Sequence, residues 1–257
     1  MSRYDSRTTT FSPEGRLHQV EYAMLSVEQA GAIVGVMAGE GMVVACEKKA
    51  TNKLLATTKA SEKVYPIDKH VSVAVAGLTS DANVLVSFLR KTAAQHRLQY
   101  NEAIPVESLV TRVADHKQLM TQYGGQRPFG VSFLFCGYDR HYKFQMYSTN
   151  PSGNYAMYRA LALGPNAQAA NNLLKKEFKE SLSIPDALAL AVKVLVKTLD
   201  AATPSAETLE LTAFRKAAHS DELVPQTLST EEVTKLLDAF KVAEEEEKKK
   251  EEAKAAY

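Results

Sequence analysis

Short apolar segments occur in two groups along this chain of 257 residues, and a pair of amphipathic helices follows each group. Apolar runs of roughly four to eight residues bounded by turn residues predict strands. Because the turns between neighbouring runs are short, as at residues 38–41, the strands of each group are expected to be antiparallel. The predicted strands cover residues 32–37, 42–46, 64–67, 71–75, 131–136, 142–148, 155–158 and 208–214.

Helices are predicted where apolar residues recur every three or four positions. Ser80 and Asp81 are expected to cap one helix, and Pro105 takes a favourable first position in the next. Ser183 and Asp186 form a capping-box variant at the start of another. The apolar positions of the predicted helices lie within residues 17–27, 84–89, 106–113, 169–178, 188–199 and 233–240.

The order of these elements, with no linker long enough to divide the chain, predicts the fold class. Each sheet is expected to bury one face against the other sheet and the opposite face under helices. The sequence therefore predicts an α+β fold, a four-layer αββα sandwich, in a single domain over residues 13–240. The polar residues 1–12 are expected to form a mobile N-terminal arm. Residues 241–257 are expected to form a charged tail, helical or disordered, with partner docking or targeting as the alternative role.

Charge and composition exclude several classes of protein. Lys and Arg total 31 against 30 Asp and Glu, so the net charge of +1 gives no reason to expect nucleic acid or an anionic membrane as a partner. No apolar stretch approaches the roughly 20 residues that cross a bilayer. Cys46 and Cys136 are expected to be buried free thiols, with one long-range disulfide as the alternative. The polar N-terminus has no apolar signal segment, which predicts a location in the cytoplasm and nucleus.

No pattern of this chain points to a metal or a cofactor. The six histidines do not occur at metal-ligand spacing, and the glycine-rich segments lack the patterns that hold phosphate. Gly130 and Ser132 begin like a nucleophile elbow, but the closing glycine is absent. Ser132 is therefore predicted to be an ordinary strand residue, and no metal or cofactor site is predicted.

The N-terminal block carries the most specific signal in the sequence. Residues 4–7 read Tyr-Asp-Ser-Arg, and residues 11–23 read Phe-Ser-Pro-Glu-Gly-Arg-Leu-His-Gln-Val-Glu-Tyr-Ala. This block resembles the signature of proteasome alpha subunits, and segments 61–64, 75–82 and 123–132 also resemble that family. The resemblance covers about residues 3–240. It implies the N-terminal-nucleophile hydrolase sandwich, which agrees with the layer order predicted above.

The resemblance also bears on catalysis. In the related beta subunits, an N-terminal threonine at the start of the first strand supplies both the nucleophile and, through its amine, the base. The corresponding position here is Gly31, which has no hydroxyl group and follows 30 other residues. Glu47 and Lys63 fall about where a beta subunit places its acid and its lysine. The resemblance therefore implies a subunit without catalytic residues. One alternative is a free-standing amidohydrolase that uses Ser2, and another is a free-standing binding module.

The function implied by the resemblance is structural and regulatory. Seven different alpha subunits form the outer ring of the 20S proteasome, which supports assembly of the beta ring, restricts the passage of substrate and docks activators. The implied partners are therefore the other alpha subunits of a hetero-heptameric ring, the beta-ring subunits, and regulatory-particle ATPases or other activators.

Two sets of residues match functional positions of the family. In the gate, Tyr4 and Asp5 match the arm residues, and Pro13 and Tyr22 match the positions that brace the open arm; Ser6 replaces an arginine that many members carry. In the pocket for activator tails, Lys63 matches the lysine that pairs with a terminal carboxylate, with an exposed strand lysine as the alternative. Ala30, which stands where many relatives have glycine, would lie close to the mouth of this pocket. The remaining residues expected around the pocket are Gly31, Gly77 and Leu78.

Overall fold

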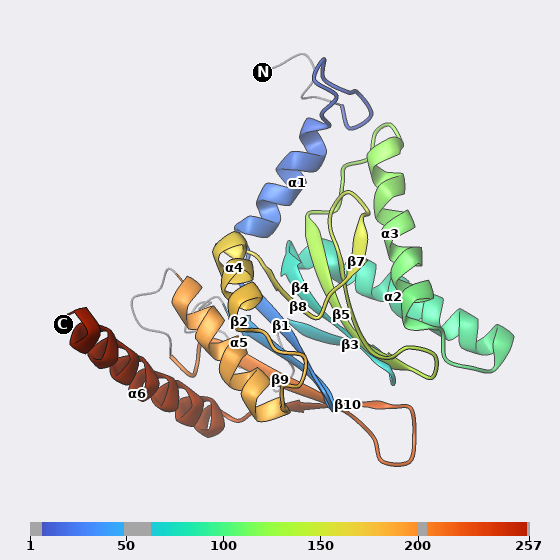
Figure 1. The fold of residues 1–257 in the computed structure, drawn as a ribbon. Helices are drawn as coiled ribbons and strands as arrows, with labels where there is room; N and C mark the ends of the chain where they lie inside the picture. Colours follow the sequence, from blue (N-terminus) through green and yellow to red (C-terminus); the bar gives the residue numbers. More distant parts are fainter. Residues whose placement is uncertain (1–6, 49–62, 200–204, 256–257) are drawn as a thin grey trace, which may run out of the picture.

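Two five-stranded sheets face each other in the computed structural model, which describes residues 7–48, 63–199 and 205–255 (Figure 1). All paired strands are antiparallel, and the strand orders are β10-β9-β2-β1-β8 and β3-β4-β5-β6-β7. The strands of the first sheet are β1 (Ile33–Ala38), β2 (Gly41–Glu47), β8 (Ala160–Leu163), β9 (Leu209–Lys216) and β10 (Leu223–Thr227). Those of the second sheet are β3 (Val64–Asp68), β4 (Val71–Gly77), β5 (Val131–Asp139), β6 (Lys143–Thr149) and β7 (Tyr155–Met157).

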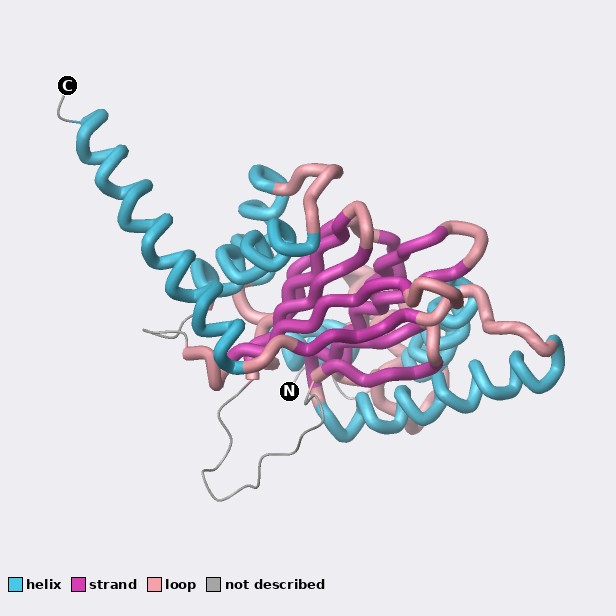
Figure 2. Tube along the Cα trace, turned by 90° about the horizontal axis from the view of Figure 1, so that it is seen from below, coloured by secondary structure: helices cyan, strands magenta, loops and turns pink. Residues whose placement is uncertain are grey.

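Helices cover the outer face of each sheet and confirm the predicted four layers. Helices α2 (Thr79–Tyr100) and α3 (Val106–Gln122) lie side by side over the second sheet, and α4 (Ala167–Glu177) and α5 (Ile184–Thr198) cover the first (Figure 1). Helix α6 (Thr230–Ala255) packs against α5 and then projects away from the sandwich (Figure 2). Helix α1 (His18–Glu28) lies at one end of the sandwich, against β4 and β5.

The core consists of three apolar layers, because the central strands are buried on both faces. Within β1, Val34 and Val36 pack under α5, whereas Ile33 points between the sheets. Double burial explains why these strands read as nearly continuous apolar runs. Cys46 and Cys136 lie between the sheets as buried free thiols, as predicted, and burial raises the pKa of Cys46 to about 12.

The structure corrects some details of the predicted elements. Helix α2 begins after Leu78 with no side-chain cap, so the expectation that Ser80 and Asp81 cap it is wrong. The cap at Ser183 is confirmed, since its hydroxyl oxygen accepts the N–H of Asp186 at 3.3 Å. Strands β8 and β10 were not predicted. Pro105 precedes the first residue of α3 instead of occupying it.

Candidate functional site

Gly31 is a buried residue in the short segment that joins α1 to β1. The residue after it, Ala32, donates its N–H to the Glu47 carboxylate at 2.9 Å, and Glu47 returns its own N–H to the Ala32 carbonyl at 2.8 Å. The ammonium of Lys63 is buried beside Gly31. The structure thus brings together Gly31, Glu47 and Lys63, the three positions that the resemblance matches to the nucleophile, the acid and the lysine of a beta subunit.

The space around Gly31 leaves no room for a side chain. A Cβ atom at this position would collide with Lys63 Nζ and lie 2.6 Å from the Glu47 carbonyl oxygen, closer than real Cβ contacts. Because the carbonyl belongs to the backbone of β2, it cannot turn away as a side chain can. Gly31 also lies inside the chain, three residues after the end of α1, so its nitrogen is an ordinary amide. Neither a hydroxyl nucleophile nor a free amine is available here.

Gly77 and Leu78 lie at the end of β4, where the chain turns into α2. Gly77 has a φ of +134°, and a Cβ atom there would collide with the Gly130 carbonyl oxygen. Leu78 donates its N–H to that same oxygen at 2.9 Å, and the residue is 45% exposed. Lys63 joins this region through its carbonyl, which accepts the Val75 N–H at 3.0 Å.

Ala30, the remaining residue expected near the pocket, follows α1 and is half-buried. Its N–H donates to the Val27 carbonyl at 3.1 Å, and it packs on the layer between the sheets. Gly31 therefore lies against the Lys63 side chain directly after Ala30, whereas Gly77 and Leu78 belong to the end of β4.

Pro13 occupies an exposed turn before α1. This turn is held by Ser12, whose carbonyl accepts the Gly15 N–H at 2.9 Å and whose hydroxyl oxygen accepts the Arg16 N–H at 3.1 Å. A φ of +78° at Gly15 explains the glycine. Arg16 then makes two 2.7 Å hydrogen bonds to the Glu21 carboxylate on α1. The turn is thus linked to the first helix.

Tyr22 lies on α1 with 46% of its surface exposed. Its ring stacks on the His18 ring, with 6.3 Å between the centroids. The other two predicted gate residues, Tyr4 and Asp5, lie outside the described residues, as do Ser2 and Ser6.

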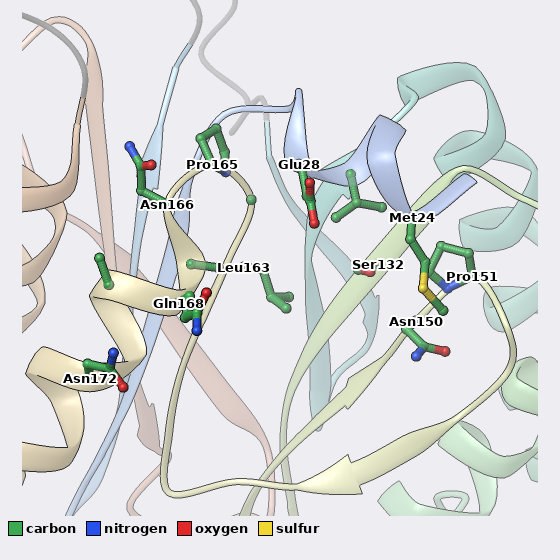
Figure 3. Close-up of a pocket in the computed structure, with 14 residues that line it drawn as sticks. Met24, Glu28, Ser132, Asn150, Pro151, Leu163, Pro165, Asn166, Gln168 and Asn172 are labelled. Carbon is green, nitrogen blue, oxygen red and sulfur yellow. The ribbon is translucent and has the colours of Figure 1, made fainter. Parts of the chain in front are cut away.

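A cavity of about 750 Å³ lies beneath α1, between the β6–β7 turn and the segment that leads into α4 (Figure 3). Met24 and Glu28 extend over it from α1, and Asn150 and Gln168 lie on its two sides (Figure 3). Ser132 lines it as a 4% exposed residue of β5, and none of the described residues that line it is a histidine or a lysine.

Metal ligands and membrane spans were also sought in residues 7–48, 63–199 and 205–255. Within these ranges, no group of three or more His, Cys, Asp or Glu side chains is placed to hold a metal ion. No helix in the same ranges is both long and apolar enough to cross a membrane.

Two sequence comparisons identify the family. Residues 27–213 match the family model described as proteasome subunit, and residues 4–24 match the N-terminal signature of proteasome A subunits. The chain belongs to the proteasome alpha-subunit family. The sandwich described above is the fold that the resemblance implied.

Individual alpha subunits are similar to this chain over most of its length. Proteasome subunit alpha type-4-2 of Oryza sativa subsp. indica is 51% identical over 235 residues, which is 91% of this chain and 94% of the relative. Alpha type-4 of Dictyostelium discoideum is 50% identical over 240 residues, covering 93% and 94%. Alpha type-3 of Saccharomyces cerevisiae is 46% identical over 235 residues, covering 91% of each. The Ser-Arg-Tyr-Asp-Ser-Arg start and the Glu/Lys-rich tail likewise most resemble the eukaryotic alpha type-4 subunit.

This alpha-family chain also holds an ion pair between a buried aspartate and a largely exposed arginine, which the sequence did not reveal. Both terminal nitrogens of Arg127 donate to the Asp81 carboxylate, at 2.6 and 2.7 Å, and the Gly130 N–H donates to it at 3.0 Å. The Arg127 guanidinium holds the pKa of Asp81 below its usual value. An aspartate at the start of a helix is typical of a cap, which obscured its pairing with a residue 46 positions away.

Proposed function

We propose that this chain is a non-catalytic structural subunit of the outer alpha ring of a 20S proteasome. The observation that carries the proposal is the position of Gly31, which lacks a hydroxyl group, follows a helix and has the Lys63 ammonium against it. A threonine placed there would need both Lys63 and the Glu47 backbone to move. The alternative, a free-standing amidohydrolase that uses Ser2, has no such support, because Ser2 is far ahead of β1 in the sequence.

We further propose that the segment before α1 contributes to a gate over the ring's pore. Residues 1–12 contain only two aromatic side chains and no aliphatic one beyond Met1, so little free energy is lost when the arm changes position. The turn at Pro13 is supported by Ser12 and by the Arg16–Glu21 ion pair, which gives the arm a fixed base. Tyr22 exposes its ring on the same helix. These contacts support the proposal of an arm that moves relative to a turn fixed to α1.

Docking of activator tails is proposed at Lys63, Gly77 and Leu78. The half-exposed Leu78 offers apolar surface for a peptide, and Gly77 lets the backbone turn closely against Gly130 just before it. The Lys63 ammonium can pair with a terminal carboxylate only after turning from its buried position beside Gly31. A charge-assisted bond of this kind contributes about 1.5–3 kcal/mol, which orders a tail but does not hold an activator alone.

The proposed surroundings of the chain follow from this function. Its neighbours are six other alpha subunits in a hetero-heptameric ring, with this chain at the third position, that of alpha type-4. Its other partners are the beta ring and the regulatory-particle ATPases or other activators. The proposed location is the cytoplasm and nucleus, where such particles degrade ubiquitin-marked and other proteins.

Isolation of the chain from its native cells through a C-terminal tag tests this function. We expect native mass spectrometry to show a large particle that contains six other alpha-type chains, with threonine-dependent peptide cleavage by other subunits. Ser2→Ala in this chain should leave that cleavage unchanged. A chain that arrives alone at 28.2 kDa and hydrolyses amides would overturn the proposal.

A further inference from the structure

The Gly130 carbonyl oxygen accepts two hydrogen bonds from different parts of the molecule. One comes from the Leu78 N–H at 2.9 Å, at the proposed tail pocket. The other comes from the Ser26 hydroxyl on α1, at 3.2 Å. A carbonyl oxygen has two lone pairs, so both bonds can form together. One atom therefore touches both the pocket and the helix that follows the gate arm.

Gly130 is packed too tightly to move independently of these neighbours. A Cβ atom on it would lie 2.5 Å from the Ser26 hydroxyl oxygen and 3.1 Å from Leu78 Cδ1. On the other side, its N–H donates to the buried Asp81 carboxylate at 3.0 Å. A displacement of Leu78 must therefore shift Gly130, because close-packed atoms transmit displacement instead of absorbing it.

The Ser26 hydroxyl has a second acceptor. It lies 2.7 Å from the Ala23 carbonyl oxygen, within its own helix. A hydroxyl carries one proton, so this group can give a full hydrogen bond to Gly130 or to Ala23, and it stays satisfied when it exchanges one for the other. The contact between α1 and Gly130 can thus be made or released without leaving a donor unpaired.

We propose that Gly130 couples the tail pocket to α1 and that Ser26 is the positioning residue that makes this coupling. Displacement at Leu78 when a tail binds shifts the Gly130 carbonyl and changes the acceptor of Ser26. That change alters how firmly α1, and the arm before it, is held to the second sheet. The inference rests on the proposed roles of the pocket and the arm, although the coupling itself can be measured without either.

The first test uses the assembled particle with Ser26→Ala in this chain and a short peptide with a free C-terminal carboxylate. The matched control is Ser87→Ala, because Ser87 also bonds a carbonyl of its own helix, that of Asn83 at 2.9 Å. In the wild type and in Ser87→Ala, we expect the peptide to change amide hydrogen exchange over residues 18–28 by about two- to tenfold, the effect of one neutral hydrogen bond. In Ser26→Ala this change should disappear. An equal change in all three particles would overturn the proposal.

A second test needs no peptide and so separates this inference from the proposed pocket. Asp81→Asn weakens the acceptor of the Gly130 N–H and should raise exchange over residues 18–28. The rise should be smaller when Ser26→Ala is also present, because the coupled hydroxyl is then missing. Strictly additive effects would refute the coupling. If the two effects are non-additive but the peptide changes no exchange rate, the coupling between Gly130 and α1 is supported and the proposed tail pocket is contradicted.

Discussion

The Arg127 guanidinium and the Asp81 carboxylate form a two-point ion pair across 46 residues of sequence, at 2.6 and 2.7 Å. The Asp81 side chain is only 8% exposed, whereas that of Arg127 is 63% exposed. The pair thus fixes the segment before β5 onto the first turn of α2 from the solvent side.

Loss of the Asp81 charge should destabilise the chain. We expect Asp81→Asn to lower the free energy of unfolding by about 1–2 kcal/mol, less than for a fully buried pair because Arg127 is largely exposed. Denaturant unfolding of the purified chain measures this change. Asp221→Asn is the control, because its 2.6 Å pair with Arg140 is exposed to solvent and should contribute little to stability. Equal losses in both variants would contradict the prediction.

The same pair predicts acid sensitivity. Since the pKa of Asp81 is lowered in the folded state, its stabilisation is present above the unfolded pKa of about 3.9 and disappears as the pH falls through the folded value. The stability gap between the wild type and Asp81→Asn should therefore close in this acid range. A gap that is constant from neutral pH to below pH 3 would rule out the assignment.

A buried lysine on α3 predicts that stability also depends on pH in the neutral to alkaline range. Lys117 is fully buried, and its ammonium donates to the Val131 carbonyl at 3.0 Å and to the Thr149 hydroxyl at 2.9 Å. Burial lowers its pKa to about 7. The unfolded chain then binds more protons between about pH 7 and 10.4, so stability should rise with pH in this window, by at most about 1.4 kcal/mol per unit.

Substitution of Lys117 isolates this effect. Lys117→Met should flatten the rise in stability between pH 7 and 10, because the group that takes up the proton on unfolding is gone. Lys175→Met, on the exposed side of α4, should leave the slope unchanged. Thermal unfolding at several pH values measures both variants, and an unchanged slope in Lys117→Met would show that another group titrates.

The packing at Gly31 predicts that a nucleophile cannot be restored by one substitution. We expect Gly31→Thr to show no peptide cleavage and to lose about 1–3 kcal/mol of stability from overpacking. Gly31→Ala should lose less in a Lys63→Ala background, where the collision with Nζ is removed and that with the Glu47 carbonyl remains. Equal losses of stability in the two backgrounds, measured by denaturant unfolding, would contradict the contact between Lys63 and residue 31.

Removal of the Lys63 charge should affect activation. We expect Lys63→Ala to weaken binding of an activator tail about tenfold or more, from loss of one charge-assisted bond, and to reduce activator-stimulated peptide cleavage while ring assembly stays intact. Lys69→Ala is the control, because that exposed lysine pairs with Glu222 at the far end of the sandwich. If the activator stimulates peptide cleavage equally in Lys63→Ala and the wild type, the proposed tail pocket at Lys63 is contradicted.

The layers of this fold could be predicted because the buried strands are apolar on both faces and the helices on one. Strand β10 could not, since only Leu223 in it is buried and Pro225 is a residue found on edge strands. Strand β8 is four residues long, at the lower limit of an apolar run that predicts a strand, and its two end residues are only partly buried. Short edge elements like these depend on the neighbour they pair with, which a local pattern does not contain.

The residues of the candidate site were named from the resemblance to the family, which says nothing of their surroundings. Gly31 was located by matching the first strand to that of the related beta subunits, whereas the burial of the Lys63 ammonium against it depends on contacts in the folded chain. Asp81 was misread as a cap because its partner is remote. Ser26 carried no signal at all, since its second contact spans 104 residues.

The crowding at Gly31 has an evolutionary consequence. Catalysis at this position would require a hydroxyl side chain at residue 31, a displaced lysine, a shifted strand backbone and removal of the 30 residues that precede residue 31. None of these changes is useful without the others. The proposed non-catalytic role is therefore protected against reversal by point mutation, and the sandwich is free to diverge as a building block.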